Sequence, residues 1–267
     1  MKFYFSYFKL RFITGLQYRA AAYAGLATQL FFGLIFIMVY LAFYESSSGK
    51  NPMEVSELVS YLWLNQAFFS LFYMLYKDGE IFDLIKNGNI AYELVRPKKL
   101  YFIWFAKIIG QRLSAVTLRC FPVLIISFFL PKPYNMVLPI GLANFILFIL
   151  TLITGTLLMT SIVTLYHVIT MKTLNEKGIP QVFAAIADLL SGLVVPIPFF
   201  PHFLQVISNY LPFRYVNDLP FRIYTGNIGL QEGLFGLGIQ LLWIVLIVGI
   251  GYIMTNKSLK RVVVQGG

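Results

Sequence analysis

Long apolar segments alternate with short polar ones along the chain, and this pattern predicts an all-α protein that crosses a membrane several times. A helix needs about 20 mainly apolar residues to span a bilayer. Six segments meet or approach that length, so we expect six transmembrane helices in a single domain. The expected spans are residues 20–44, 58–76, 101–130, 136–168, 179–197 and 233–256.

Residues 134–171 carry no formal charge over 38 positions, which is too long for one straight span and tight for two with a turn. Two spans here would give seven in all and would place the basic C-terminal segment on the opposite face from the first long polar loop. One long or broken helix keeps six spans and leaves both termini on one side. We therefore expect a long fourth span whose His167 end projects into the cytoplasm.

Basic residues orient this arrangement. Of the 21 Lys and Arg residues, fifteen fall on the side of the two termini, four fall on the other side, and Arg112 and Arg119 lie in the third span. Cytoplasmic segments carry the excess of Lys and Arg, so both termini are expected in the cytoplasm. Residues 1–18 have aromatic side chains at helical spacing, which favours an interfacial helix; the alternative is a cytoplasmic extension of the first span.

Residues 78–99, between the second and third spans, form the longest well-charged segment. Asp78 can cap a short helix over residues 79–86, which Asn87 and Gly88 can end. A loop that only connects two spans needs no apolar face, and this helix has one, so we expect it to be a partner-binding site. Its apolar face comprises Ile81, Phe82, Leu84 and Ile85, and its charged face comprises Glu80, Asp83 and Lys86.

Residues 198–230, before the last span, are too apolar for a free loop and too rich in proline for a span. We expect two short re-entrant helices, one starting at Pro201 and one capped by Asp218, with Pro220 in its first turn and Gly226 at its end. These helices would dip into the outer leaflet or cover the outer mouth of the protein.

Composition supports the membrane class. With 58% hydrophobic and 12% charged residues and a mean hydropathy of +0.75, the chain is outside the range of soluble globular domains. The net charge of +10 does not indicate nucleic-acid binding, because the basic residues are scattered between apolar segments. The single cysteine, Cys120, excludes an internal disulfide and disfavours a metal cluster. No cleavable signal peptide is indicated.

An enzyme is not indicated. The chain has two histidines, His167 and His202, and neither a zinc-protease motif nor a nucleophile elbow. The phosphate-binding motif GxxxxGK[ST] is absent, since Gly49 and Lys50 are followed by Asn51. No catalytic residue, metal site or bound cofactor is therefore expected, and any ATP that is used must be bound by another chain.

Two charged residues, Arg119 and Asp188, fall near the middle of expected spans, where an ionised group costs several kcal/mol unless it is paired or hydrated. One hypothesis is that they pair or line a polar path. The alternative is that Arg119 reaches the interface and Asp188 is protonated and packed. A stripe of hydroxyl groups could line a route or bond one helix to another; it comprises Thr154, Thr156, Thr160, Ser161 and Thr164.

This pattern resembles the ABC-2-type permeases, the membrane subunits of a class of ABC exporters, and within them a bacterial subfamily with six spans. The resemblance covers nearly the whole chain. The residues that carry it, besides the arrangement of spans, are Gly88, Ile90 and Leu94–Pro97 in segment 78–99, and Phe199–Pro201, Leu211–Phe213 and Pro220–Gly226 in segment 198–230.

The resemblance implies that segment 78–99 couples the chain to an ATPase subunit that binds ATP and Mg²⁺. It also implies that two permease protomers, identical or related, work together. The implied ATPase-coupling residues are Glu80, Ile81, Phe82, Asp83, Leu84, Ile85, Lys86 and Arg96. The implied outer gate is formed by Phe199, Phe200, Pro201, Leu211, Pro212 and Phe213.

The sequence thus predicts a permease subunit of an ABC exporter in the bacterial plasma membrane, for a hydrophobic or amphipathic substrate such as a drug, peptide or lipid. Two other classes remain open. One is an ion-coupled carrier that uses Arg119 and Asp188, and the other is a structural membrane subunit without a transport pathway.

Overall fold

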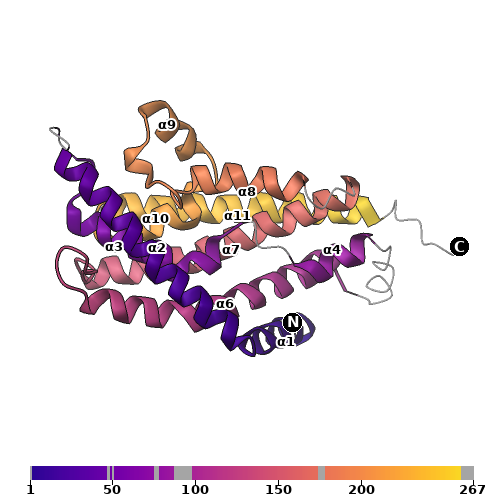
Figure 1. Ribbon diagram of the computed structural model, residues 1–267. Coiled ribbons are helices and arrows are strands. Elements are labelled where there is room, and N and C mark those ends of the chain that lie inside the picture. The colour runs from indigo at the N-terminus through magenta and orange to yellow at the C-terminus, as the bar shows by residue number, and fades with distance from the viewer. Residues whose placement is uncertain are drawn as a thin grey trace, which may run out of the picture.

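The computed structural model of the chain describes residues 2–46, 49, 51–74, 78–86, 98–173 and 178–259, and over these residues every regular element is a helix (Figure 1). The predicted helix end at Asn87 and Gly88, and the motif residues Ile90 and Leu94–Pro97 with Arg96, lie outside the described residues. The helices are α1 (Lys2–Leu16), α2 (Arg19–Ser46), α3 (Val55–Phe72), α4 (Gly79–Lys86), α6 (Leu100–Phe129), α7 (Leu142–Thr173), α8 (Gly178–Leu190), the 3-10 helix η1 (Ile197–Phe199), α9 (His202–Tyr210), α10 (Arg214–Thr225) and α11 (Leu230–Leu259).

Among the described residues, four helices are long and apolar enough to cross a membrane: α2, α6, α7 and α11. They correspond to four of the expected spans, with ends that differ by a few residues. The two remaining expected spans are shorter helices, α3 with 18 residues and α8 with 13. The structure therefore shows a multi-helix bundle with four candidate spans, and six spans are not shown.

The fourth expected span, predicted as one long or broken helix, is one continuous helix, but α7 begins at Leu142 and not at residue 136. The residues before α7 are held in a non-helical path at the surface of the bundle. The amide of Val137 donates to Ser60 Oγ at 3.1 Å, and the Val137 carbonyl accepts from Tyr224 Oη at 3.1 Å. These contacts, together with Pro139, delay the helix start.

Helix α3 begins earlier and ends earlier than the expected span 58–76. A capping box starts it at Val55, because the side chain of Glu57 accepts the Glu54 amide at 3.0 Å while Glu54 caps in return. Twelve of its 18 residues are buried, Asn65 and Gln66 among them. A helix surrounded by other helices does not need lipid-soluble side chains, which is why α3 is less apolar than a lipid-facing span.

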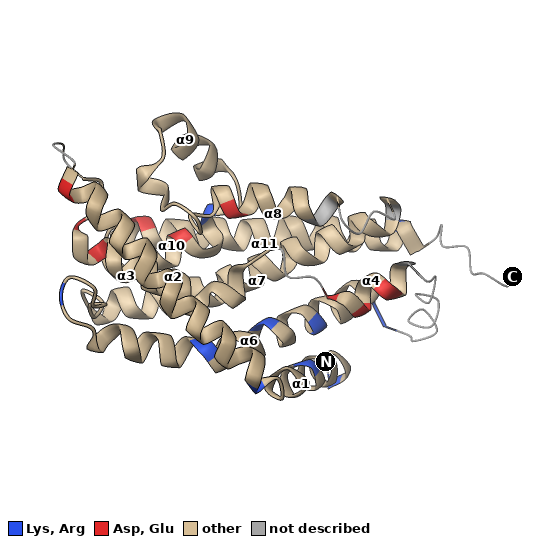
Figure 2. Ribbon diagram, in the orientation of Figure 1, with Lys and Arg blue, Asp and Glu red and all other residues tan. Residues whose placement is uncertain are grey.

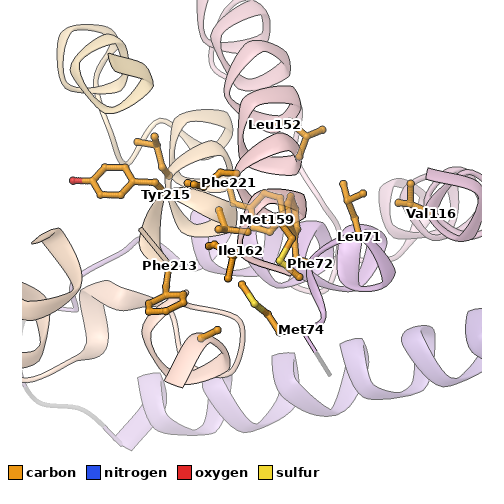
Figure 3. Packing of buried hydrophobic residues seen from close by; sticks show 14 of the residues in the cluster. Leu71, Phe72, Met74, Val116, Leu152, Met159, Ile162, Phe213, Tyr215 and Phe221 are labelled. Atoms are coloured by element: carbon orange, nitrogen blue, oxygen red, sulfur yellow. The ribbon is translucent and has the colours of Figure 1, made fainter. Parts of the chain in front are cut away.

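Helix α10 packs into the bundle against α3, α7 and α11, whereas α9 projects from it (Figure 1). Figure 3 shows side chains from α3, α7 and α10 pointing toward one another, and the Phe72 and Phe221 rings lie 5.9 Å apart. We call the end of the bundle at α4 the α4 end and the opposite end the α9 end. At the α4 end, basic residues gather on α1 and on the part of α6 near α4, and acidic residues lie on α4 (Figure 2). Toward the α9 end, acidic residues lie around α10.

Candidate functional site

Helix α4 forms as the polar pattern predicted, over Gly79–Lys86. Asp78 caps it, since its Oδ1 atom accepts the amides of Glu80 at 3.1 Å and Ile81 at 3.3 Å. The Asp78 side chain is buried, and this burial, opposed by the Arg11 charge and by the Ile81 amide, raises the pKa of its carboxyl group.

A cluster of four charged residues joins α4 and its cap to α1 and α6. The Glu80 carboxylate accepts from Lys107 Nζ of α6 at 2.8 Å and also contacts the Arg11 guanidinium of α1. Arg11 lies 3.5 Å from Asp78 Oδ1 as well. Burial alone would raise the pKa of Glu80, but the hydrogen bond and charge of Lys107, together with Arg11, outweigh it and lower the pKa. The cluster fixes α4 to α1 and α6.

The apolar face of α4 is used inside the chain, which corrects the expectation that it anchors a partner. Ile81, Phe82 and Ile85 are buried, and α4 packs on α7. The Phe82 ring lies 4.7 Å from the His167 ring. Periodicity identified an apolar face, but it could not show which helix would cover it. On the outer side of α4, Glu80 and Asp83 are exposed and Leu84 is half-buried, while nothing is described of the Lys86 side chain.

The His167 end of α7 is covered by α4 and is not exposed to solvent, and its projection into the cytoplasm stays a prediction. His167 is fully buried beside Tyr166 and Trp104 as well as Phe82. Its Nδ1 atom lies 2.7 Å from the Val163 carbonyl oxygen. Because α4 covers this part of α7, the α4 end of the bundle is a packed layer and not a loose loop.

Arg112 links α6 to the end of α3, a role that the sequence pattern did not indicate. It is buried, and its Nη1 atom donates to the carbonyls of Leu71 at 2.8 Å and Tyr73 at 2.9 Å. These carbonyls end α3, where helical partners run out. Arg112 therefore ties α6 to the point where α3 passes into the polar segment.

Arg119 and Asp188 are not brought together. Arg119 of α6 donates to the Ala21 carbonyl of α2 at 3.4 Å, and its guanidinium lies against Gly25. Asp188 of α8 accepts from the backbone of Met74. Arg119 therefore lies beside the first turns of α2 and not beside the middle of α2. The reason is that the first half of α6 packs along α1, which precedes α2 in the chain. The hypothesis that the two residues pair with each other is therefore not supported by the described contacts, and a polar path stays untested.

A second polar cluster lies at the α9 end, around Asp218. This residue was expected to cap a helix, but α10 starts at Arg214 and Asp218 lies fully buried inside it. Its Oδ2 atom is 3.5 Å from Arg214 Nε and 3.6 Å from Arg222 Nη1, and its Oδ1 atom accepts from Tyr61 Oη at 3.0 Å. The spacing of four residues on either side of Asp218 was a usable signal for this triad. Gly226 ends α10 with a φ of 82°, as expected.

Backbone and amide groups extend this cluster across the bundle. The Gly192 carbonyl accepts from Tyr61 Oη at 3.0 Å and from Asn65 Nδ2 at 3.3 Å. Asn217 Nδ2 donates to Asn65 Oδ1 at 3.2 Å. Gln240 of α11 donates to the Thr151 carbonyl of α7 at 3.0 Å and to the Tyr215 carbonyl at 2.6 Å. Helix α10 is thereby bonded to α3 and α11 and, through Gln240, to α7.

The residues assigned to an outer gate flank α9, three before its start and three after its end. Phe199 packs between two tyrosines of α2, with ring centroids 5.4 Å from Tyr40 and 6.2 Å from Tyr44. Phe200 and Phe213 are buried. Pro201 precedes α9, and Leu211 and Pro212 connect α9 to α10. A gating role for these six residues stays a prediction.

The hydroxyl stripe on α7 is not arranged as a route. The hydroxyls of Thr156, Thr160, Ser161 and Thr164 donate to carbonyls of their own helix four residues earlier, and these residues are buried. Thr154 also donates to Gln240, so the alternative of a bond between helices holds for this residue.

Four long apolar helices, a capped polar helix tied to one end and buried polar clusters between helices define a multi-pass membrane protein. A family model described as ABC-2 family transporter protein matches residues 13–266. Because the match covers nearly the whole chain, this protein belongs to the ABC-2 transporter family, and the resemblance seen in the sequence is confirmed. Members of this permease family typically lack an ATPase domain. A search of curated proteins gave no significant match.

Proposed function

We propose that the chain is the permease subunit of an ABC exporter and that α4, with the segment following it, receives the force of a separate ATPase subunit. The observation that carries this proposal is the attachment of α4. Ion pairs join it to α1 and α6, and apolar contacts join it to α7. A push on α4 is therefore passed to three helices at once, which suits rigid-body rocking of the bundle.

The ATPase contact is proposed on the exposed side of α4, not on its buried apolar side. Asp83 is exposed there, and Glu80 keeps half of its side chain accessible while it holds Lys107. Charged residues at the rim of an interface orient a partner and speed its association. In the proposed complex the ATPase binds ATP and Mg²⁺.

Six crossings with both termini in the cytoplasm remain the proposed topology. Helix α3 is about 27 Å long at 1.5 Å per residue, close to the roughly 30 Å of a bilayer core. Helix α8 is about 20 Å long, so it must be continued by the turn at Gly192 and by η1 to complete a crossing. The proposed cytoplasmic side is the α4 end, where the basic residues of α1 and α6 gather (Figure 2).

The proposed assembly contains two permease protomers, identical or related, and two ATPase subunits in the bacterial plasma membrane. The proposed substrate is a hydrophobic or amphipathic molecule, which accords with the 17% aromatic content of the chain. An ion-coupled carrier is not favoured, because the two charges on which that hypothesis rested contact different helices.

Co-expression of the full chain with a candidate ATPase that carries a phosphate-binding loop tests the coupling role. Asp83→Arg should lower the amount of co-purified ATPase more than tenfold, since opposed like charges in an interface cost several kcal/mol and each step of about 1.4 kcal/mol is a factor of ten in affinity. Glu45→Arg makes the same charge change at an exposed position near the α9 end and should have no effect. Equal recovery of the ATPase with both variants would show that the coupling site does not lie on the exposed side of α4.

A further inference from the structure

A pocket of about 410 Å³ lies where α1 ends, α2 begins and α6 passes both. We call it the α1–α2–α6 pocket. Its lining includes two arginines, Arg11 and Arg119, and the polar side chains of Thr14, Gln111 and Ser114. Its volume falls within the roughly 300–1,000 Å³ that is usual for small-molecule sites.

The pocket is built by close approach of the helices. A Cβ atom on Gly25 of α2 would lie 2.5 Å from Arg119 Cζ, so glycine at this position lets the guanidinium of α6 lie flat against α2. The Arg119 side chain is thereby held at the mouth of the pocket, beside the Ala21 carbonyl. Tyr18 and Ala21, which also line the pocket, are exposed and mark its opening.

The charged side chains that line the pocket are both cationic. Among the described lining residues there are two guanidinium groups, Arg11 and Arg119, and no carboxylate. The acids nearest to it, Asp78 and Glu80, approach Arg11 from α4 and do not line the pocket. Helix α1, which forms one wall, carries no Asp or Glu along its length.

The surface beyond the pocket is apolar. From the level of Arg119 toward the α9 end, large exposed side chains follow on both neighbouring helices, namely Tyr23 of α2 and Phe121 and Ile125 of α6. A pocket that is lined by arginine and lies next to exposed apolar side chains matches a molecule with an anionic head and apolar tails. Basic pockets between transmembrane helices on the cytoplasmic side are known to bind phosphate headgroups of anionic lipids.

We propose that the α1–α2–α6 pocket binds the phosphate-bearing headgroup of an anionic phospholipid through Arg119, with the acyl chains lying along α2 and α6. This site is separate from the α4 surface proposed for the ATPase, and it concerns lipid binding and not the transport reaction. The same pocket chemistry would accept free phosphate, so the two sources of the phosphate group have to be distinguished by experiment.

The test is native mass spectrometry of the full chain in detergent with added phosphatidylglycerol or phosphatidylcholine. Phosphatidylglycerol should bind more tightly, and Arg119→Gln should weaken its binding about tenfold or more, since a hydrogen bond to a charged group contributes that much. Lys9→Gln removes a charge from an exposed position of α1 outside the pocket and is the matched control, with binding expected to be unchanged.

Ala115→Phe is the second variant, because it fills the pocket without changing any charge. It should weaken phosphatidylglycerol binding even if Arg119→Gln does not fold. Unchanged binding in Ala115→Phe, or equal binding of the two lipids to the native chain, would overturn the proposal. So would displacement of the lipid by millimolar inorganic phosphate, which would assign the pocket to the free anion. These readouts do not depend on the ATPase, so a failed lipid site leaves the coupling proposal intact.

Discussion

Replacing Asp218 with asparagine tests whether the buried cluster around α10 holds the bundle together. Asp218 is fully buried, and its carboxylate lies between Arg214 and Arg222 and accepts from Tyr61. The amide side chain of the Asp218→Asn variant can keep an acceptor for the tyrosine, but the substitution removes the negative charge that faces the two guanidiniums. The perturbation is therefore almost purely electrostatic.

Removing one partner of a buried ion pair costs about 3–5 kcal/mol, because the other charge is left uncompensated. Here the loss should be at or just below the lower end of that range, at about 2–3 kcal/mol. The side chains of Arg214 and Arg222 are 11% and 15% exposed, and each keeps another partner. Arg214 contacts Glu232 at 3.6 Å, and Arg222 donates to Asn227 at 2.7 Å.

The assay is reversible unfolding of the purified full chain in mixed micelles, with Glu232→Gln as the matched control. The Glu232 side chain is 60% exposed and faces Arg214 from the solvent side, so its loss should cost no more than about 1 kcal/mol. If Asp218→Asn destabilises the protein no more than Glu232→Gln does, the Asp218 cluster is not what secures α10.

Two further predictions concern single positions. Gly192→Ala should destabilise the chain by about 1–3 kcal/mol in the same unfolding assay, because Gly192 has a φ of 79° and a Cβ there would lie 2.5 Å from Tyr61 Oη. Gly238→Ala, in a helix and facing open space, should be neutral or slightly stabilising. Glu80→Gln should cost about 0.2–1 kcal/mol, since its ion pair with Lys107 is partly exposed. The folded state lowers the pKa of Glu80, so the loss of stability caused by Glu80→Gln should be complete above about pH 4.5 and should vanish as the pH falls through the lowered pKa. A loss of stability that persists in acid would contradict this prediction.

Local signals in the sequence determined where most helices lie and what class of protein they make. Apolar length predicted α2, α6 and α11, because spanning a bilayer imposes a minimum run of apolar residues on the chain itself. For residues 134–171 the distribution of basic residues predicted one long or broken helix, and the structure shows that α7 is continuous. The sequence also predicted Asp78 and Gly226 as helix boundaries. A cap acts on amides two or three residues away, so its chemistry is contained in a short segment.

Only the tertiary structure decided which surfaces are covered and which charges meet. The sequence showed that α4 has an apolar face, but α7, a helix far along the chain, is what covers Ile81 and Phe82. Arg119 and Asp188 matched in expected depth, yet helix packing sends them to different neighbours. Asp218 was taken for a cap, whereas burial against α3 makes it the centre of a charged triad. Packing depends on contacts between distant residues, and a periodic pattern carries no information on which partner will supply them.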